Sequence, residues 1–145
     1  MDFDILKNKF TNKDARLLNP LVLAFIGDAI YEVFIRTYLV DINRDMLVHK
    51  LHVKTISFVK AHAQSDFMKG LEIGLTEEEL YFYKRGRNAK SGTVPKNAEV
   101  QEYRAATGFE ALVGYLYITE QNQRLNFIFN EILKLNGEQI SKLES

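Results

Sequence analysis

Two apolar segments, each with an acid in its interior, constrain the fold of this 145-residue chain most. The first, AFIGDAIYEVF, spans residues 24–34 and contains Asp28, and the second, ATGFEALVGYLYI, spans residues 106–118 and contains Glu110. Apolar residues cover most of the circumference of either segment when it is helical, so we expect two central helices. A carboxylate buried in such surroundings is costly unless a partner compensates it. The fold must therefore supply compensation for both acids.

The rest of the chain also has helical periodicity, and no alternation of apolar and polar residues indicates a strand. Asn19 and Pro20 suit the cap and first turn of a helix that we expect to end near residue 39. Thr76 and Glu79 have the spacing of a capping box. The other predicted features are two helices between residues 43 and 72 with a break near 55–57, a helix that ends near Gly86, a loop over 88–97, and helices over 98–119 and 122–136.

The composition indicates one ordinary globular domain over residues 1–145, with a core over about 18–136 and a frayed tail from residue 137. The absence of cysteine excludes disulfides and thiolate metal sites. The N-terminus does not resemble a signal peptide, and no apolar run approaches the about 20 residues that span a bilayer, so we expect a cytoplasmic protein without a membrane segment. A formal net charge of +0 argues against a uniformly basic protein but leaves local patches open.

If the two apolar helices pack together, Asp28 and Glu110 could meet. Like charges a few ångströms apart repel, so one acid would stay protonated or a cation would neutralise both. Oxygen ligands without cysteine favour a hard divalent ion such as Mg²⁺, with water completing its shell. The alternative is that each acid separately binds core groups or an arginine, and the pattern leaves both possibilities open.

A basic segment lies between the two acids. Residues 80–98, LYFYKRGRNAKSGTVPKNA, contain five cations and no acid. A cationic loop with polar donors could follow a phosphate backbone, although a solvated loop balanced by neighbouring acids would have the same composition. The candidate RNA-binding residues are Lys84, Arg85, Arg87, Asn88 and Lys90, with further polar groups at Ser91, Lys96 and Asn97.

Two smaller features have less specific patterns. Tyr103 lies seven residues before Glu110 on the same helical face and could orient a water, although a packed aromatic would fit as well. His49, His52 and His62 include an H-x-x-H pair, but no acid stands at metal-motif spacing, so we expect surface or packing roles for the histidines.

Taken together, these motifs resemble the ribonuclease III family. LAFIGDAIYE resembles the signature helix of its catalytic domain, TGFEALVGYLYI resembles its second acidic helix, and the segment from KRGRN onwards is most similar to the short Mini-ribonuclease III subfamily, which lacks a double-stranded-RNA-binding domain. The likeness covers about residues 18–133. It implies an all-α endonuclease domain that forms a two-fold homodimer, uses Mg²⁺, and hydrolyses double-stranded RNA to 5′-phosphate and 3′-hydroxyl ends. The subfamily's substrate, precursor 23S ribosomal RNA, is implied as well.

The resemblance makes Asp28 and Glu110 the catalytic residues and metal ligands, with Asp28 acting directly or through a water. Ala24 and Thr107 stand where the broader family has further acids, so Thr107 joins Tyr103 as a supporting residue. Fewer carboxylates predict weak metal affinity, with water and RNA phosphate completing the shell. The departures also leave a catalytically silent RNA-binding module on the same fold as an alternative, and a helical interaction protein without RNA as a third possibility.

Overall fold

Helices are the regular secondary structure of the protein over residues 4–90 and 99–144, which the computed structural model describes, and no strand occurs there. The long helices are α2 (Pro20–Ile42), α6 (Val100–Ile118) and α7 (Asn122–Glu144). The shorter elements are η1 (Asp4–Leu6), α1 (Asn12–Leu17), α3 (Val48–Val59), α4 (Ala61–Leu71), η2 (Glu72–Gly74) and α5 (Glu77–Asn88). The all-α prediction is confirmed for these residues. None of their helices combines the length and hydropathy needed to cross a bilayer.

Capping side chains begin α2 and α5 as predicted. The Asn19 side chain accepts a hydrogen bond from the backbone N–H of Leu21 at 2.8 Å. Thr76 and Glu79 form both bonds of a capping box, at 3.1 Å and 3.0 Å. These bonds satisfy N–H groups that have no partner within the first helical turn, and they explain why the helices begin where they do.

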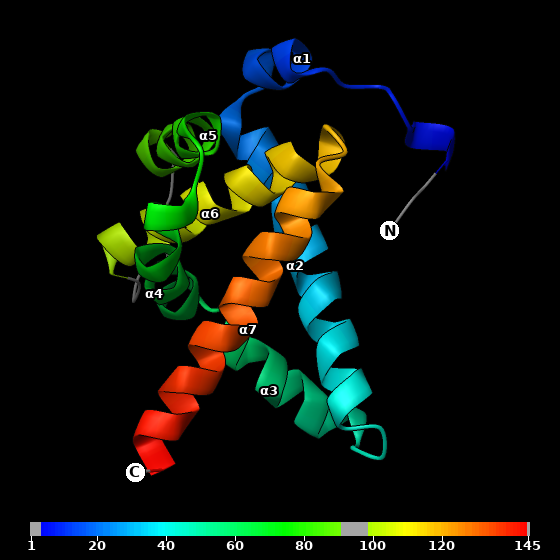
Figure 1. Cartoon of the computed structure of the whole chain (residues 1–145), viewed down its shortest axis with the longest axis vertical. Helices are drawn as coiled ribbons and strands as arrows, with labels where there is room; N and C mark the ends of the chain where they lie inside the picture. The colour runs from blue at the N-terminus through cyan, green and yellow to red at the C-terminus, as the bar shows by residue number, and fades with distance from the viewer. Residues whose placement is uncertain (1–3, 91–98, 145) are drawn as a thin grey trace.

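Helix α6 forms the centre of the core because α2, α4, α5 and α7 all pack against it. Phe109 is fully buried and meets Tyr31 of α2 edge to face, with ring centroids 4.9 Å apart. Phe82 of α5 stacks on Tyr115 with centroids 3.8 Å apart. Figure 1 shows α6 running between α2 and α5, with α7 crossing the molecule towards the C-terminus. The prediction of a central helix is therefore confirmed for α6.

Helix α2 buries one face and exposes the other. Its buried residues are Leu23, Ala24, Gly27, Tyr31, Ile35 and Leu39. On the exposed side, Phe25 is 79% exposed, and Val22 and Val33 are 44% and 41% exposed. The predicted central position therefore holds for one face of α2, which packs on α6, whereas its neighbours among the described residues leave an apolar strip of the other face uncovered.

Several predicted boundaries differ from the structure, and α2 continues to Ile42, past its predicted end near residue 39. The break between α3 and α4 falls at Lys60, where the backbone is extended, and not at residues 55–57, because Phe58 continues the buried side of α3. Helix α5 passes Gly86 and ends at Asn88, because Gly86 packs closely on α6, and α7 continues to Glu144, past the predicted end at residue 136. The predicted loop over 88–97 lies largely outside the described residues, as do Ser91, Lys96 and Asn97.

Candidate active site

Two glycines allow α2 and α6 to cross in backbone contact. A Cβ added to Gly27 would overlap the backbone carbonyl of Glu110, and one added to Gly114 would overlap the carbonyl of Leu23. A side chain at either position would force the helices apart. The crossing therefore brings the backbone before Asp28 directly against the backbone of Glu110.

The crossing places the carboxyl groups of Asp28 and Glu110 side by side. Burial, then a hydrogen bond with Asp28 and the negative charge of Asp28, raise the pKa of Glu110 from 4.5 to about 8. The two acids therefore meet, as one of the two alternatives requires, and their binding of a cation stays a prediction. A pair of this kind favours either a retained proton or a bound cation.

The structure corrects the expected burial of the acids. Glu110 is half-buried, but Asp28 is exposed. The contact with α6 is made by Gly27, and the next residue projects about 100° further around the helix, towards solvent. The prediction that Asp28 is a core acid is therefore wrong, because its side chain is open to solvent.

Two buried polar side chains surround Glu110 on its inner side. The Tyr31 hydroxyl donates to the Phe58 carbonyl at 3.1 Å, and burial followed by the charge of Glu110 raises the pKa of Tyr31. Gln64 of α4 is 2% exposed, and a hydrogen bond with it lowers the pKa of Glu110. The sequence reasoning missed Gln64. The sequence did contain a signal for it, because Gln64 is a polar residue on the apolar side of α4. It stands three positions before Phe67 and four before Met68.

The basic end of α5 packs against α6 two residues before Glu110 along the chain. A Cβ added to Gly86 would lie 2.9 Å from the Cα of Gly108 and 3.0 Å from the carbonyl oxygen of Thr107. Glu110 is less than one helical turn further along α6. The structure thus brings the predicted cationic segment and an acid of the pair to neighbouring parts of one helix.

The predicted RNA-binding residues differ in their accessibility. Lys84, Asn88 and Lys90 are exposed. Arg87 is half-buried, and its Nε donates to the Asn88 side chain at 3.2 Å. These four residues present cations and polar groups at the surface where α5 ends, which is compatible with contacts to phosphate.

Arg85 is turned towards the protein. Its Nη2 donates to the Leu18 carbonyl at 3.1 Å, and its guanidinium lies 5.6 Å from the centre of the Tyr81 ring. Its Nη1 is buried and has no hydrogen-bond partner among the described residues. Arg85 therefore links α5 to the end of α1, just before α2 begins, and its predicted contact with RNA stays a prediction.

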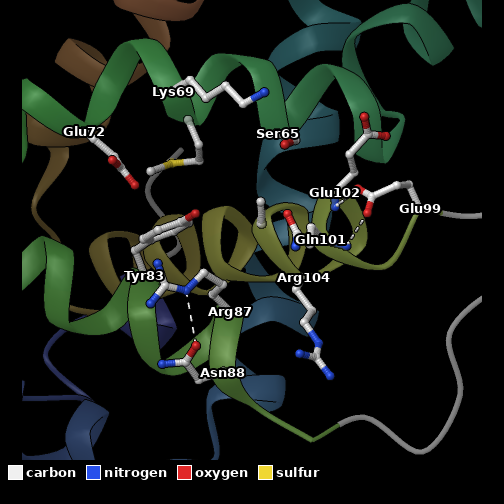
Figure 2. Close-up of a pocket in the computed structure, with 12 residues that line it drawn as sticks. Ser65, Lys69, Glu72, Tyr83, Arg87, Asn88, Glu99, Gln101, Glu102 and Arg104 are labelled. Atoms are coloured by element: carbon white, nitrogen blue, oxygen red, sulfur yellow. Dashed lines mark hydrogen bonds between the residues drawn. The ribbon is translucent and has the colours of Figure 1, made fainter.

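A cleft of about 440 Å³ opens between α4, the end of α5 and the start of α6. Figure 2 shows Tyr83, Arg87 and Asn88 along α5, with Lys69 and Glu72 on the facing helix and turn. Cations and acids both line it, so its charge alone specifies no ligand. The cleft shows that the end of α5 borders an open surface.

The supporting residues lie on α6. Thr107 is half-buried, and its hydroxyl donates to the Tyr103 carbonyl at 3.0 Å, a bond within the helix. Tyr103 is also half-buried. Their proposed roles near the acids stay predictions.

The histidines do not form a metal site in the described part of the chain. His49 and His52 are exposed. His62 bridges α4 and α6, with its Nδ1 2.7 Å from Glu102 and its Nε2 3.2 Å from Asp66. The bond to Glu102 and the charge of Asp66 raise the pKa of His62. The predicted surface or packing roles fit these positions.

Two carboxylates are the acidic groups gathered at the crossing. Across residues 4–90 and 99–144, no group of three or more His, Cys, Asp or Glu residues is arranged to hold a metal ion. A hard cation at Asp28 and Glu110 would therefore take most of its oxygen ligands from water or from a bound phosphate.

This chain matches a protein-family model, and it is similar to named relatives and to a solved structure. The Ribonuclease III domain model matches residues 21–121, which include both acids. Mini-ribonuclease 3 of Clostridium tetani is 53% identical over 92% of this chain and 88% of its own length, and that of Enterococcus faecalis is 49% identical over 87% and 96%. A crystal structure of a protein from Fusobacterium nucleatum has a TM-score of 0.71 at 30% identity, covering 93% of this chain and 99% of that one.

Proposed function

Because the chain belongs to the ribonuclease III family, and within it to the Mini-ribonuclease 3 group, it is an endoribonuclease of double-stranded RNA, and we propose that it cuts RNA at the Asp28–Glu110 pair with Mg²⁺. One observation carries the choice of site. The α2–α6 crossing sets the two acids together at a surface that solvent reaches through Asp28.

The donor set at the crossing fits a hard divalent cation. Both groups are carboxylates, and burial, followed by the hydrogen bond with Asp28 and the charge of Asp28, raises the pKa of Glu110, so a positive charge between them would relieve an existing cost. When bound, Mg²⁺ would activate the attacking water and stabilise charge on the scissile phosphate. With two carboxylates available, affinity without RNA should be weak. Titration of Mg²⁺ into RNA-free protein by calorimetry tests this, and a micromolar Kd would contradict it.

The two acids have different tasks in this proposal. Glu110, which is half-buried and held on the central helix, would be a direct ligand. Asp28, which is exposed at the rim, would bind a water of the shell or orient the attacking water by accepting its hydrogen bond. The backbone contact at Gly27 would keep the two carboxylates at a constant spacing during the reaction.

The end of α5 would hold the RNA backbone. Lys84 and Lys90 would pair with phosphates, and Arg87 and Asn88 would donate to phosphate or sugar oxygens. Lys84, Asn88 and Lys90 are exposed, which supports this assignment, whereas Arg85 is largely engaged by Leu18. Duplex RNA is recognised mainly through its shape and backbone, so these contacts need no particular sequence.

We propose that the exposed apolar side of α2 forms a homodimer. Phe25, Val22 and Val33 would meet the same residues of a second copy, as a two-fold interface requires. Phe25 lies one turn before Asp28, so two active sites would flank the interface and each could cut one strand. Phe25→Arg should convert a dimer into a monomer in light scattering, and a wild-type monomer would contradict the proposal.

Precursor 23S ribosomal RNA is the proposed substrate in the cell, supported by the resemblance to the Mini-ribonuclease III subfamily. Depletion of the protein should leave 23S ends extended when they are mapped by primer extension. Mature ends in depleted cells would contradict this substrate.

A catalytically silent RNA-binding module is the second candidate, because Ala24 and Thr107 supply no carboxylate at the crossing. A long RNA duplex incubated with Mg²⁺ separates the two. Cleavage by the wild type that is lost in Asp28→Asn and Glu110→Gln supports the endonuclease at this site. An intact duplex in Mg²⁺ that is nevertheless retarded in a gel with Ca²⁺ supports the silent module.

A further inference from the structure

The end of α3 leaves backbone carbonyls without helical partners, and two side chains next to Glu110 bind them. The Tyr31 hydroxyl donates to the Phe58 carbonyl at 3.1 Å, and Nε2 of Gln64 donates to the Val59 carbonyl at 2.7 Å. Tyr31 and Gln64 are 0% and 2% exposed. The corner between α3 and α4 therefore holds both side chains in place without help from solvent.

The Gln64 amide keeps hydrogen-bonding capacity after this contact. A glutamine amide has two N–H donors and one acceptor oxygen, and the Val59 bond uses one N–H. A hydrogen bond with Gln64 lowers the pKa of Glu110, which is the effect of a donor beside an ionised carboxylate. Oε1 of Gln64 is buried and has no hydrogen-bond partner among the described residues. An unsatisfied buried group of this kind requires a specific reason, such as a site water.

We propose that Gln64 is a positioning residue of the active site, whose amide is anchored on Val59, fixes the Glu110 carboxylate towards Asp28 and offers Oε1 to a water of the site. The inference rests on the proposed function of the acid pair. Helix α4 packs directly against α6, so the amide acts across one helix contact. Partners that orient a metal ligand typically change metal affinity or activity by about 10–100-fold when they are removed.

Gln64→Met tests the proposal because methionine keeps the length and flexibility of the side chain but has no amide. The Mg²⁺ concentration that gives half-maximal cleavage of an RNA duplex should rise by about 10-fold or more. Thr55→Val is the matched control, since Thr55 is 3% exposed and its hydroxyl donates to the Leu51 carbonyl at 2.9 Å within α3. This control should keep the wild-type Mg²⁺ dependence. Equal Mg²⁺ dependence in the two variants would overturn the inference.

A spectroscopic measurement decides the inference independently of cleavage. In ¹⁵N-labelled protein, the side-chain amide signals of Gln64 should exchange slowly with solvent and should shift when Glu110→Gln is introduced, but not with Thr55→Val. If the Gln64 signals do not shift in Glu110→Gln, the inference is overturned, even if Gln64→Met fails to fold. A wild type that leaves duplex RNA uncut in Mg²⁺ would instead refute the proposed function, whatever the amide signals show.

Discussion

Glu79 and Glu110 are carboxylates on neighbouring helices with opposite surroundings. Glu79 is 2% exposed, accepts two hydrogen bonds from Arg124 at 2.7 Å each, and accepts a third from the backbone of Thr76. Burial raises the pKa of Glu79, but the bonds from Arg124 and Thr76 outweigh it, so the pKa is lowered overall. Burial also raises the pKa of Glu110, but its neighbour Asp28 raises it further instead of lowering it, so the pKa reaches about 8.

The difference separates an acid that stabilises the fold from one suited to function. Arg124 neutralises Glu79 and joins α5 to α7. None of the ion pairs between described residues includes Asp28 or Glu110. Perturbed acids that face a like charge in an accessible position are characteristic of functional sites. The α2–α6 crossing therefore places two like groups together, whereas the α5–α7 contact pairs its carboxylate with a cation.

Catalysis should distinguish the two acids most strongly. Glu110→Gln should slow cleavage of duplex RNA by about 1,000-fold, since loss of the proposed metal ligand would remove several kcal/mol of charge stabilisation. Glu79→Gln should leave the rate near that of the wild type, because Glu79 binds Arg124 and takes no part in the proposed acid pair. Initial rates at saturating Mg²⁺ measure both, and a similar loss in the two variants would break the comparison.

Stability should show the reverse order. Arg124→Met leaves Glu79 buried without its cation and should cost about 3 kcal/mol, the lower end for a broken buried pair, because the Arg124 side chain is 31% exposed. Glu110→Gln should be neutral or stabilising in the same urea titration, because it removes the repulsion from Asp28. Unfolding of Arg124→Met at the wild-type urea concentration would show that the Glu79 pair is not structural.

The pH dependence of stability should have opposite signs for the two acids. The pKa of Glu110 is raised on folding, so its favourable contribution is complete below about pH 4.5 and is lost as the pH rises through about 8. The pKa of Glu79 is lowered, so its contribution is present above about pH 4.5 and is lost as the pH falls through the folded-state pKa. The Tm of Glu110→Gln relative to wild type should therefore climb with pH up to about pH 8. A constant difference across that range would contradict this assignment.

The smallest expected effect concerns RNA affinity. Replacing both Lys84 and Lys90 by alanine should weaken duplex binding and reduce the slope of log K against log salt by about 2, one for each lost phosphate contact. Lys134→Ala, which removes an exposed cation of α7, should leave the slope unchanged. Binding measured in Ca²⁺ at several salt concentrations tests the pair, and an unchanged slope would exclude these lysines from the interface.

Arg85→Ala should lower the stability of the fold, because it loses the hydrogen bond to the Leu18 carbonyl.

The sequence predicted the features that depend on local chemistry. The Asn19 cap and the capping box at Thr76 and Glu79 involve residues two or three apart, so their spacing is visible in the chain. The meeting of Asp28 and Glu110 was one of two alternatives that the sequence left open, because each acid interrupts an apolar helix that has to pack.

Features that depend on which side of a helix is covered were not visible. Phe25 and Ala29 stand next to Asp28 in its turn of helix and are themselves exposed, so apolar neighbours in the sequence do not bury the acid. The change of direction at Lys60 has no glycine or proline to mark it. The contacts of Gln64 join three helices, and a single chain pattern does not reveal them.

The glycine contact has a consequence for anyone who wants to redesign this enzyme. Because α2 and α6 touch through main chain at Gly27 and Gly114, exchanging core side chains elsewhere alters how firmly the helices adhere but not how far apart they stand. Substitutions in the surrounding hydrophobic core should therefore leave the distance between the two carboxylates unchanged. If the pair binds the proposed cation, a change of preferred ion size would have to begin with the helix spacing, for instance at Gly114, before any acid is replaced.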